Sequence, residues 1–234
     1  RFFAGDFGNQ PTNDVVKLGM LKTDAGVKLV GVALDGRHVD LREVDHTLPA
    51  TLHELLAQPE GLATAARALA TGINKGPFVT GTWLPPIERP GKIFCIGLNY
   101  RDHAAETNSP IPTEPIVFSK FSSAIVGPDV PVVLPAVSQE VDWEAELVVV
   151  IGQGGKNIPQ SKAMSHVAGY VSGNDVSARD WQKGRPGGQW LLGKTPDTFA
   201  PIGPYLVTAD EVGNPHDLRI QLRLNGETVQ DSRT

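Results

Sequence analysis

Three closely spaced prolines, Pro85, Pro86 and Pro90, divide this chain of 234 residues. Proline lacks a backbone N–H and fixes its own φ angle, so the stretch around them can be neither a helix interior nor a central strand. We therefore expect a domain boundary here, with a small αβ domain over residues 1–85 and a larger domain over residues 86–234. The chain is long enough for a substantial hydrophobic core.

The hydrophobic pattern of the first domain changes once along the chain, from that of strands to that of helices. Two strand-like segments come first, and a hairpin turn follows them before Val39 and Leu41, where Asp-Gly supplies the positive φ angles that a tight turn needs. Capping-box spacing and an Ala-rich stretch that ends near a glycine then indicate two short helices. These segments are, in chain order, Val15 to Met20, Val27 to Leu34, Asp35-Gly36, Thr51 to Glu54 and Leu62 to Leu69.

The second domain consists of short segments rich in Val and Ile, separated by turns. Lys92 to Gly97 leads into Asn99 to Glu106, which has helical character, and Asn225-Gly226 is the strongest hairpin signal in the chain. We therefore expect an α+β protein that is mainly β. The other strands predicted here are Ile116 to Ser119, Val130 to Leu134, Glu144 to Ile151, His166 to Ser172 and Tyr205 to Thr208.

The charge of the chain bears on its partners. A net charge of −5 and a pI near 5.7 provide no basic surface for phosphate groups, so nucleic acid and anionic membranes are poor candidates, and we expect a small-molecule partner. No stretch approaches the roughly 18 apolar residues of a membrane span. The single cysteine, Cys95, lies in an apolar run and indicates a buried, inert thiol. The chain begins with Arg1 rather than Met, which is compatible with removal of a targeting segment, so cytoplasm and mitochondrial matrix both stay open.

Glu144 and Glu146 are the first candidates for chemistry. They stand two apart at the front of the apolar run Leu147 to Ile151, so in a strand both carboxylates leave the same face. Two carboxylates beside such a run repel each other and resist desolvation, and a divalent cation is one remedy. The alternative is a solvated strand end, which is the commoner explanation of a bare Glu-x-Glu pair.

Asp175 adds a third carboxylate. It follows the strand-like segment Val167 to Ser172, where a Gly-Asn bend can project its side chain from the strand end. Three carboxylates without a nearby Cys or His form an all-oxygen site, which suits Mg²⁺, Mn²⁺ or Ca²⁺ better than zinc. The alternative for Asp175 is an Asx-turn or a helix N-cap.

His103 and Glu106 form a candidate catalytic pair. They are three apart, so on a helix they share a face, and a carboxylate beside an imidazole raises its basicity and fixes its tautomer. Such a pair can take a proton from water or from a substrate carbon. From spacing alone, an ordinary surface pair explains these residues as well.

Two lysines stand beside apolar runs, where lysine seldom lies without an anionic partner. Lys194 follows Trp190 to Gly193 and could neutralise the carboxylates or a substrate acid, unless its ammonium extends into solvent. Lys120 could hold an acid group of the substrate. Gln189 and Thr198 are candidate hydrogen-bond donors to the same substrate.

Together these motifs resemble the fumarylacetoacetate hydrolase superfamily, from about residue 90 to the end of the chain. They occur in the order of that family and at similar separations, and their wording is most similar to the branch of the fumarylacetoacetate hydrolase domain-containing protein 2. The residues that carry the resemblance are Gly97 to His103, Val141 to Leu147, Gly173 to Asp180 and Leu192 to Thr195.

The resemblance implies a mixed β-roll catalytic domain, a homodimer, and Mg²⁺ or Mn²⁺ on Glu144, Glu146 and Asp175. It also implies that His103 acts as a base with Glu106, and that Lys194 supports an oxyanion. Members of this family continue beyond the point that corresponds to Thr234, so we expect the catalytic domain to be incomplete at its C-terminus.

The resemblance leaves several functions open. We place first a metal-dependent hydrolase that cleaves C–C bonds of acylpyruvate-like or fumarylacetoacetate-like acids. The alternatives in the same chemistry are a keto–enol tautomerase and a decarboxylase of oxaloacetate, since all of them stabilise an enolate. From other classes, a catalytically inactive module that binds dicarboxylates and a structural β-rich protein without metal stay open.

Overall fold

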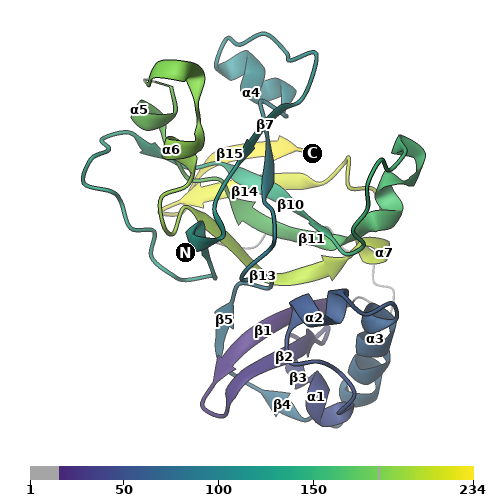
Figure 1. The fold of residues 1–234 in the computed structure, drawn as a ribbon. Helices are drawn as coiled ribbons and strands as arrows, with labels where there is room; N and C mark the ends of the chain where they lie inside the picture. The colour runs from purple at the N-terminus through teal and green to yellow at the C-terminus, as the bar shows by residue number, and fades with distance from the viewer. Residues whose placement is uncertain (1–15, 184) are drawn as a thin grey trace.

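The computed structural model describes residues 16–183 and 185–234, and it is mainly β, as the sequence predicts (Figure 1). Val15, the first residue of the first predicted strand, lies outside the described residues. The strands that build the large sheet are β1 (Lys17–Thr23), β2 (Gly26–Val32), β3 (His38–Asp40), β4 (Phe78–Val79), β5 (Thr82–Leu84), β8 (Ile125–Val126), β10 (Ala145–Ile151), β11 (Val167–Asn174) and β13 (Ala200–Thr208).

The other strands form three small pairs, and the helices are short apart from α3. The strand pairs are β6 (Phe94–Gly97) with β7 (Ile116–Ser119), β9 (Val141–Asp142) with β12 (Ser177–Ala178), and β14 (Arg219–Leu224) with β15 (Glu227–Arg233). The α-helices are α1 (Leu41–Val44), α2 (Leu52–Leu56), α3 (Gly61–Gly72), α4 (Arg101–Glu106), α5 (Arg179–Gln182), α6 (Leu191–Lys194) and α7 (Ala209–Val212), and the 3-10 turns are η1 (Ser122–Ala124), η2 (Gln160–His166) and η3 (Pro186–Gly188).

One sheet runs through both parts of the chain, in the order β10-β11-β13-β1-β2-β3-β4. Its two parts join where β1 pairs antiparallel with β13, Leu18 lying opposite Leu206. The buried core is continuous across this junction, since Leu18, Leu52, Val171 and Leu206 belong to one cluster. The N-terminal part lies below the rest in Figure 1, with α1, α2 and α3 beside β1–β3. The division at residue 85 stays a prediction.

Local signals are confirmed where a short segment decides the structure. Thr51 and Glu54 make both hydrogen bonds of a capping box at the start of α2. Asn225 and Gly226 have φ angles of 53° and 90° and join β14 to β15, as the hairpin signal predicts. The predicted strand over Val130–Leu134 is wrong, because this segment forms no ladder. Pro131 has no N–H to donate, and the N–H of Val133 bonds the side chain of Thr198 instead of a neighbouring strand.

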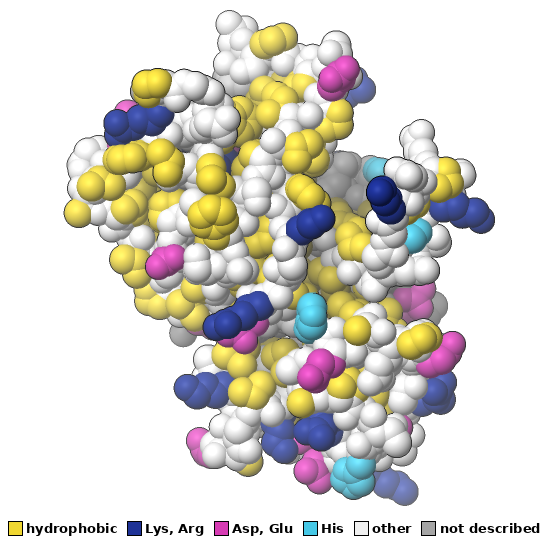
Figure 2. Space-filling view, viewed as in Figure 1, with side chains coloured by type: hydrophobic (Ala, Val, Ile, Leu, Met, Phe, Trp, Pro, Cys, Tyr) yellow, Lys and Arg dark blue, Asp and Glu magenta, His cyan; other side chains and the backbone are white. Residues whose placement is uncertain are grey.

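The β6–β7 strand pair has one face toward the interior and one toward solvent. Phe94, Ile96 and Val117 are exposed by 69%, 42% and 57%, while Cys95 and Phe118 point to the other face. Figure 2 shows hydrophobic side chains gathered on the face that carries β7. In the described part of the chain, no helix has the length and apolar character that crossing a membrane requires.

Candidate functional site

Glu144 and Asp175 are brought together by the pairing of β10 with β11. Ala145 lies opposite Asn174 in this antiparallel ladder, so the residue before β10 meets the residue after β11. The N–H of Asp175 donates to the Glu144 carbonyl at 2.8 Å, and the N–H of Glu144 donates to Asn174 Oδ1 at 2.9 Å. The strand over Glu144–Ile151 is confirmed apart from its first residue, and the two carboxylates face one region.

Lys194 supplies the positive charge between these two carboxylates. Its side chain is 2% exposed, and its Nζ lies 2.9 Å from Glu144 Oε2 and 2.8 Å from Asp175 Oδ2. The α6 helix ends at Lys194 and carries it to this place. Of the two alternatives for this lysine, neutralising carboxylates and extending into solvent, the structure has the first.

Lys120 is also buried, and protein acceptors surround its ammonium. Its Nζ donates to the carbonyls of Val176 at 2.8 Å and Phe199 at 2.9 Å, and to that of Lys194. It also lies 2.7 Å from Asp175 Oδ1. An ammonium has three protons, and three carbonyls already accept them. This arrangement does not favour the predicted contact between Lys120 and a substrate acid.

Arg179 holds the other oxygen of Glu144, and the sequence analysis gave it no role. Its Nη2 lies 2.7 Å from Glu144 Oε1 and 2.8 Å from Asp142 Oδ2, and its Nη1 donates to Gln182 Oε1 at 2.9 Å. Burial alone would lower the pKa of Arg179, but Glu144 and Asp142 outweigh it and raise the pKa. The signal was present in the motif Gly173 to Asp180, but spacing does not reveal which acid an arginine will meet.

Glu146 lies close enough to Glu144 and Asp175 for their charges to act on its carboxyl group. Burial raises the pKa of Glu146 to about 8, and the negative charges of Glu144 and Asp175 add to this shift. Tyr100, the residue before α4, hydrogen-bonds Glu146. Burial and the charge of Glu146 raise the pKa of Tyr100. Glu146 is therefore a half-buried acid on which the negative charges of its neighbours outweigh the positive charge of Lys194.

Asp175 is held ionised by its two lysines. Burial opposes its charge, but the ammonium groups of Lys120 and Lys194 outweigh burial and keep the pKa of Asp175 below its usual value. Its Oδ1 atom is buried and receives no hydrogen bond within the described residues, although Lys120 forms an ion pair with it. A carboxylate oxygen has more than one lone pair, so Asp175 Oδ1 can take a second partner beside the Lys120 ammonium.

The donor set fits a divalent cation in its chemistry. Three carboxylates supply oxygen atoms only, as hard cations prefer. In the structure, the Lys194 ammonium lies between Glu144 and Asp175. Over residues 16–183 and 185–234, no three His, Cys, Asp or Glu side chains are arranged around one common point. A cation here would therefore share Glu144 and Asp175 with Lys194.

His103 and Glu106 are neighbours on α4. His103 Nδ1 lies 3.8 Å from Glu106 Oε2, and the side chains are exposed by 34% and 81%. No hydrogen bond or ion pair among the described residues joins either of them to the three carboxylates. The link is indirect, because Tyr100 precedes α4 and hydrogen-bonds Glu146. His103 therefore belongs to a segment that touches the acidic cluster at its other end.

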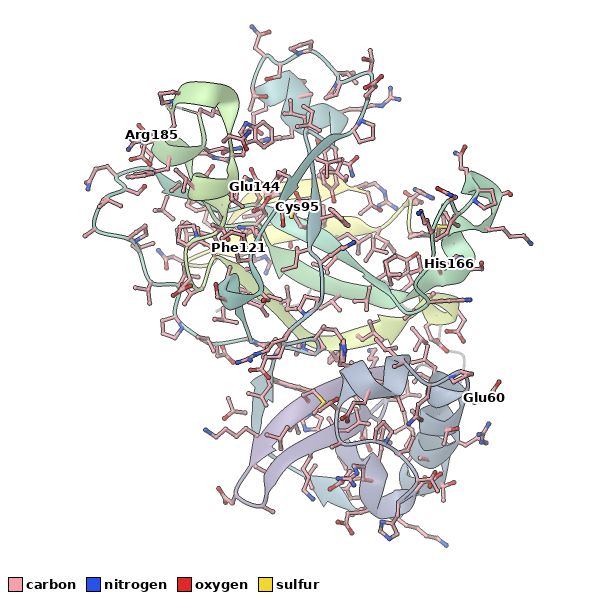
Figure 3. All side chains as sticks on the ribbon, in the orientation of Figure 1. Glu60, Cys95, Phe121, Glu144, His166 and Arg185 are labelled. Carbon is pink, nitrogen blue, oxygen red and sulfur yellow. The ribbon has the colours of Figure 1, made fainter. Side chains whose placement is uncertain are left out.

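The remaining candidates lie around the cluster. Gln189 is exposed. Thr198 has a φ angle of 71°, and its hydroxyl oxygen accepts a hydrogen bond from the Val133 N–H at 2.8 Å. Burial raises the pKa of Cys95 to about 12, and the charge of Asp175 adds to this shift, which agrees with an inert thiol. Figure 3 labels Glu144 and Cys95, which both lie in the upper part of the molecule in this view.

Comparisons with known proteins identify a matching family and similar proteins. The family described as fumarylacetoacetate (FAA) hydrolase C-terminal matches residues 92–234. The chain is 56% identical to the oxaloacetate tautomerase FAHD2A, mitochondrial, of Bos taurus over 200 residues, which are 85% of this chain and 64% of that protein. The chain thus spans less than two thirds of this relative.

Two solved structures are similar over more of the chain. A fumarylacetoacetate hydrolase from Exiguobacterium antarcticum has a TM-score of 0.76 and 30% identity, covering 93% of this chain and 75% of its own. A 5-carboxymethyl-2-hydroxymuconate delta-isomerase from Mycobacterium smegmatis has a TM-score of 0.66 and 32% identity, covering 93% and 74%. The likeness therefore includes proteins named as hydrolases and as isomerases.

Proposed function

The chain belongs to the fumarylacetoacetate hydrolase family, and on this premise we propose that the protein of which it is a part is a divalent-metal-dependent oxaloacetate keto–enol tautomerase. The observation that carries the proposal is the buried cluster of Glu144, Asp175 and Lys194, with Glu146 beside it. The relative from Bos taurus, 56% identical, is named as an oxaloacetate tautomerase. Hydrolysis of C–C bonds, which the sequence analysis placed first, is less well supported and becomes the second candidate.

The metal site of the proposal consists of Glu144, Glu146 and Asp175, with Mg²⁺ or Mn²⁺ as the ion. When bound, the ion supplies positive charge for the oxygen of an enolate that forms from a 2-oxo acid. The negative charges of Glu144 and Asp175 beside Glu146 support the proposal, since three neighbouring carboxylates are stabilised by a cation. Arg179 orients Glu144 by holding its Oε1 atom.

Lys194 has two tasks in this proposal. Its ammonium holds Glu144 and Asp175 close together in the absence of the ion and helps to lower the pKa of Asp175. Beside a substrate, the same charge stabilises negative charge on the 2-oxygen, because a fixed positive group in a buried site is not screened by water. Lys120 does not touch the substrate in this proposal. It holds Asp175 and three backbone carbonyls instead.

His103 moves the proton. In the direction from keto to enol form, the C3–H bond of oxaloacetate breaks, the imidazole takes the proton, and the electron pair moves to the 2-oxygen. The 2-oxygen then takes a proton from solvent, and the imidazolium returns its proton to solvent. Glu106 lies 3.8 Å from the imidazole and supports its positive charge. No water molecule is consumed, so tautomerisation requires less of this site than hydrolysis does. Gln189 and Thr198 remain candidates for hydrogen bonds with the substrate carboxylates.

The test follows the ultraviolet absorbance of enol-oxaloacetate after addition of the protein with Mn²⁺. We expect faster loss of the enol with the protein than with Mn²⁺ alone, without formation of pyruvate. Cleavage of an acylpyruvate at a higher rate would support the hydrolase, and pyruvate from oxaloacetate would support a decarboxylase. Binding of oxaloacetate without any turnover would favour the inactive binding module.

We also propose a compartment and an assembly. The relative from Bos taurus is named as mitochondrial, so the mitochondrial matrix is favoured over the cytoplasm. One face of the β6–β7 strand pair carries the exposed apolar side chains of Phe94, Ile96 and Val117, which supports a homodimer. Light scattering after size-exclusion chromatography measures the mass directly, and a monomer at micromolar concentration would contradict the dimer.

A further inference from the structure

The β14–β15 hairpin contacts the strand that carries the acidic pair. Gln230 of β15 forms two hydrogen bonds with the backbone of Ala145. The Ala145 N–H donates to Gln230 Oε1 at 2.9 Å, and Gln230 Nε2 donates to the Ala145 carbonyl at 3.1 Å. Ala145 stands between Glu144 and Glu146, so the side-chain amide of Gln230 is hydrogen-bonded to the backbone between the two carboxylates.

These two hydrogen bonds lie on the unpaired edge of β10. β10 is the edge strand, paired with β11 on one side only in the sheet order. Backbone groups of successive strand residues point to opposite sides. Glu144 therefore bonds Asn174 and Asp175 on the β11 side, while the N–H and carbonyl of Ala145 point away from β11. Gln230 takes the place of a neighbouring strand at this one residue.

Ser232 makes the second contact of the same strand. It lies two residues after Gln230, so both side chains leave the same face of β15, and both residues are half-buried while Asp231 between them is exposed. Ser232 Oγ hydrogen-bonds Asp102 Oδ2 in α4. Asp102 precedes His103, and its Oδ1 accepts the His103 N–H at 2.8 Å.

We propose that β15 sets the position of the acidic strand relative to the His103 helix, with Gln230 and Ser232 as positioning residues. The inference deepens the proposed function, and its kinetic part rests on it. Gln230 fixes the backbone between Glu144 and Glu146, on which the spacing of their carboxylates depends. Ser232 fixes the start of α4, on which the direction of the His103 imidazole depends. Neither residue touches the substrate.

The first variant is Gln230→Met, which keeps the length of the side chain and removes both hydrogen bonds. We expect the Mn²⁺ Kd to rise at least fivefold, and hydrogen exchange of the Ala145 amide to become at least tenfold faster. Gln221→Met is the matched control, because Gln221 is a half-buried glutamine of the same hairpin whose side chain, among the described residues, bonds Asp231 within the hairpin. If Gln230→Met fails to fold, Gln230→Asn, which is too short to reach Ala145, replaces it.

The second variant is Ser232→Ala. We expect faster hydrogen exchange over residues 101–106 and a kcat at least fivefold lower, with KM and the Mn²⁺ Kd unchanged. Ser165→Ala is the control, because the Ser165 hydroxyl bonds the Lys162 carbonyl far from α4. A merely structural role would lower the thermal midpoint without this division between metal affinity and kcat.

Two results would overturn the inference. One is Ala145 exchange and Mn²⁺ affinity in Gln230→Met equal to those of Gln221→Met. The other is exchange of α4 in Ser232→Ala equal to that of wild type. Failure of the proposed function looks different, because wild type would then show no turnover or no Mn²⁺ binding. The exchange measurements depend on neither, so they would still decide whether β15 holds both segments.

Discussion

Lys120 Nζ lies 2.7 Å from Asp175 Oδ1, and both side chains are buried. Removing one partner of a buried ion pair leaves the other without compensation, which costs about 3–5 kcal/mol. We therefore expect Lys120→Met to lower the free energy of unfolding by about that amount, measured by urea denaturation. Lys156→Met, at an exposed position, is the control. A loss below about 1 kcal/mol, within the range of exposed pairs, would show that Lys120 does not hold Asp175.

Lys194 and the proposed cation both supply positive charge to Glu144 and Asp175. In Lys194→Met, Glu144 and Asp175 lose their shared ammonium. We expect the variant to be less stable than wild type in EDTA, and Mn²⁺ to raise its thermal midpoint by more than it raises that of wild type. Differential scanning calorimetry with and without Mn²⁺ measures both shifts. Equal shifts would mean that the ion and Lys194 do not act on the same acids.

Removal of the ion tests the acidic cluster itself. An ion that binds only the folded chain stabilises it by about 2.7 kcal/mol at a free concentration 100 times its Kd. We expect EDTA to lower the thermal midpoint, Mn²⁺ to restore it, and Glu146→Gln to abolish this response. Glu114→Gln, at an exposed acid, should respond like wild type. A response that survives in Glu146→Gln would remove Glu146 from the set of ligands.

His103 distinguishes catalysis from binding. A positioned general base contributes about 10²- to 10⁴-fold to a rate, so we expect His103→Ala to lower kcat by such a factor and to leave the Mn²⁺ Kd unchanged. His53→Ala, at an exposed histidine of α2, is the control. Unchanged turnover of enol-oxaloacetate in His103→Ala would exclude it as the base.

What the sequence predicts correctly lies within short segments. The capping box of Thr51 and Glu54, the Asn225-Gly226 turn and the helix that carries His103 each depend on a few adjacent residues. The placement of Asp175 at a strand end has the same origin. Local backbone preferences and hydrophobic periodicity are sufficient for such features.

What the sequence does not predict depends on contacts between distant residues. The register that sets Ala145 opposite Asn174 decides that Glu144 meets Asp175, and no local pattern contains it. Gln230 is 85 positions away from Ala145, and its amide is not distinguishable by type or spacing from other surface amides. The predicted strand at Val130–Leu134 fails for a related reason, because Val and Ile content does not reveal whether a partner strand exists.

The most direct measurement for the central claim is anomalous diffraction from a crystal of the protein grown with Mn²⁺. We expect one manganese peak within about 2.0–2.6 Å of carboxylate oxygens from Glu144, Glu146 and Asp175. A manganese peak elsewhere, or none at these acids at saturating Mn²⁺ with Lys194 still between Glu144 and Asp175, would contradict the metal-dependent mechanism.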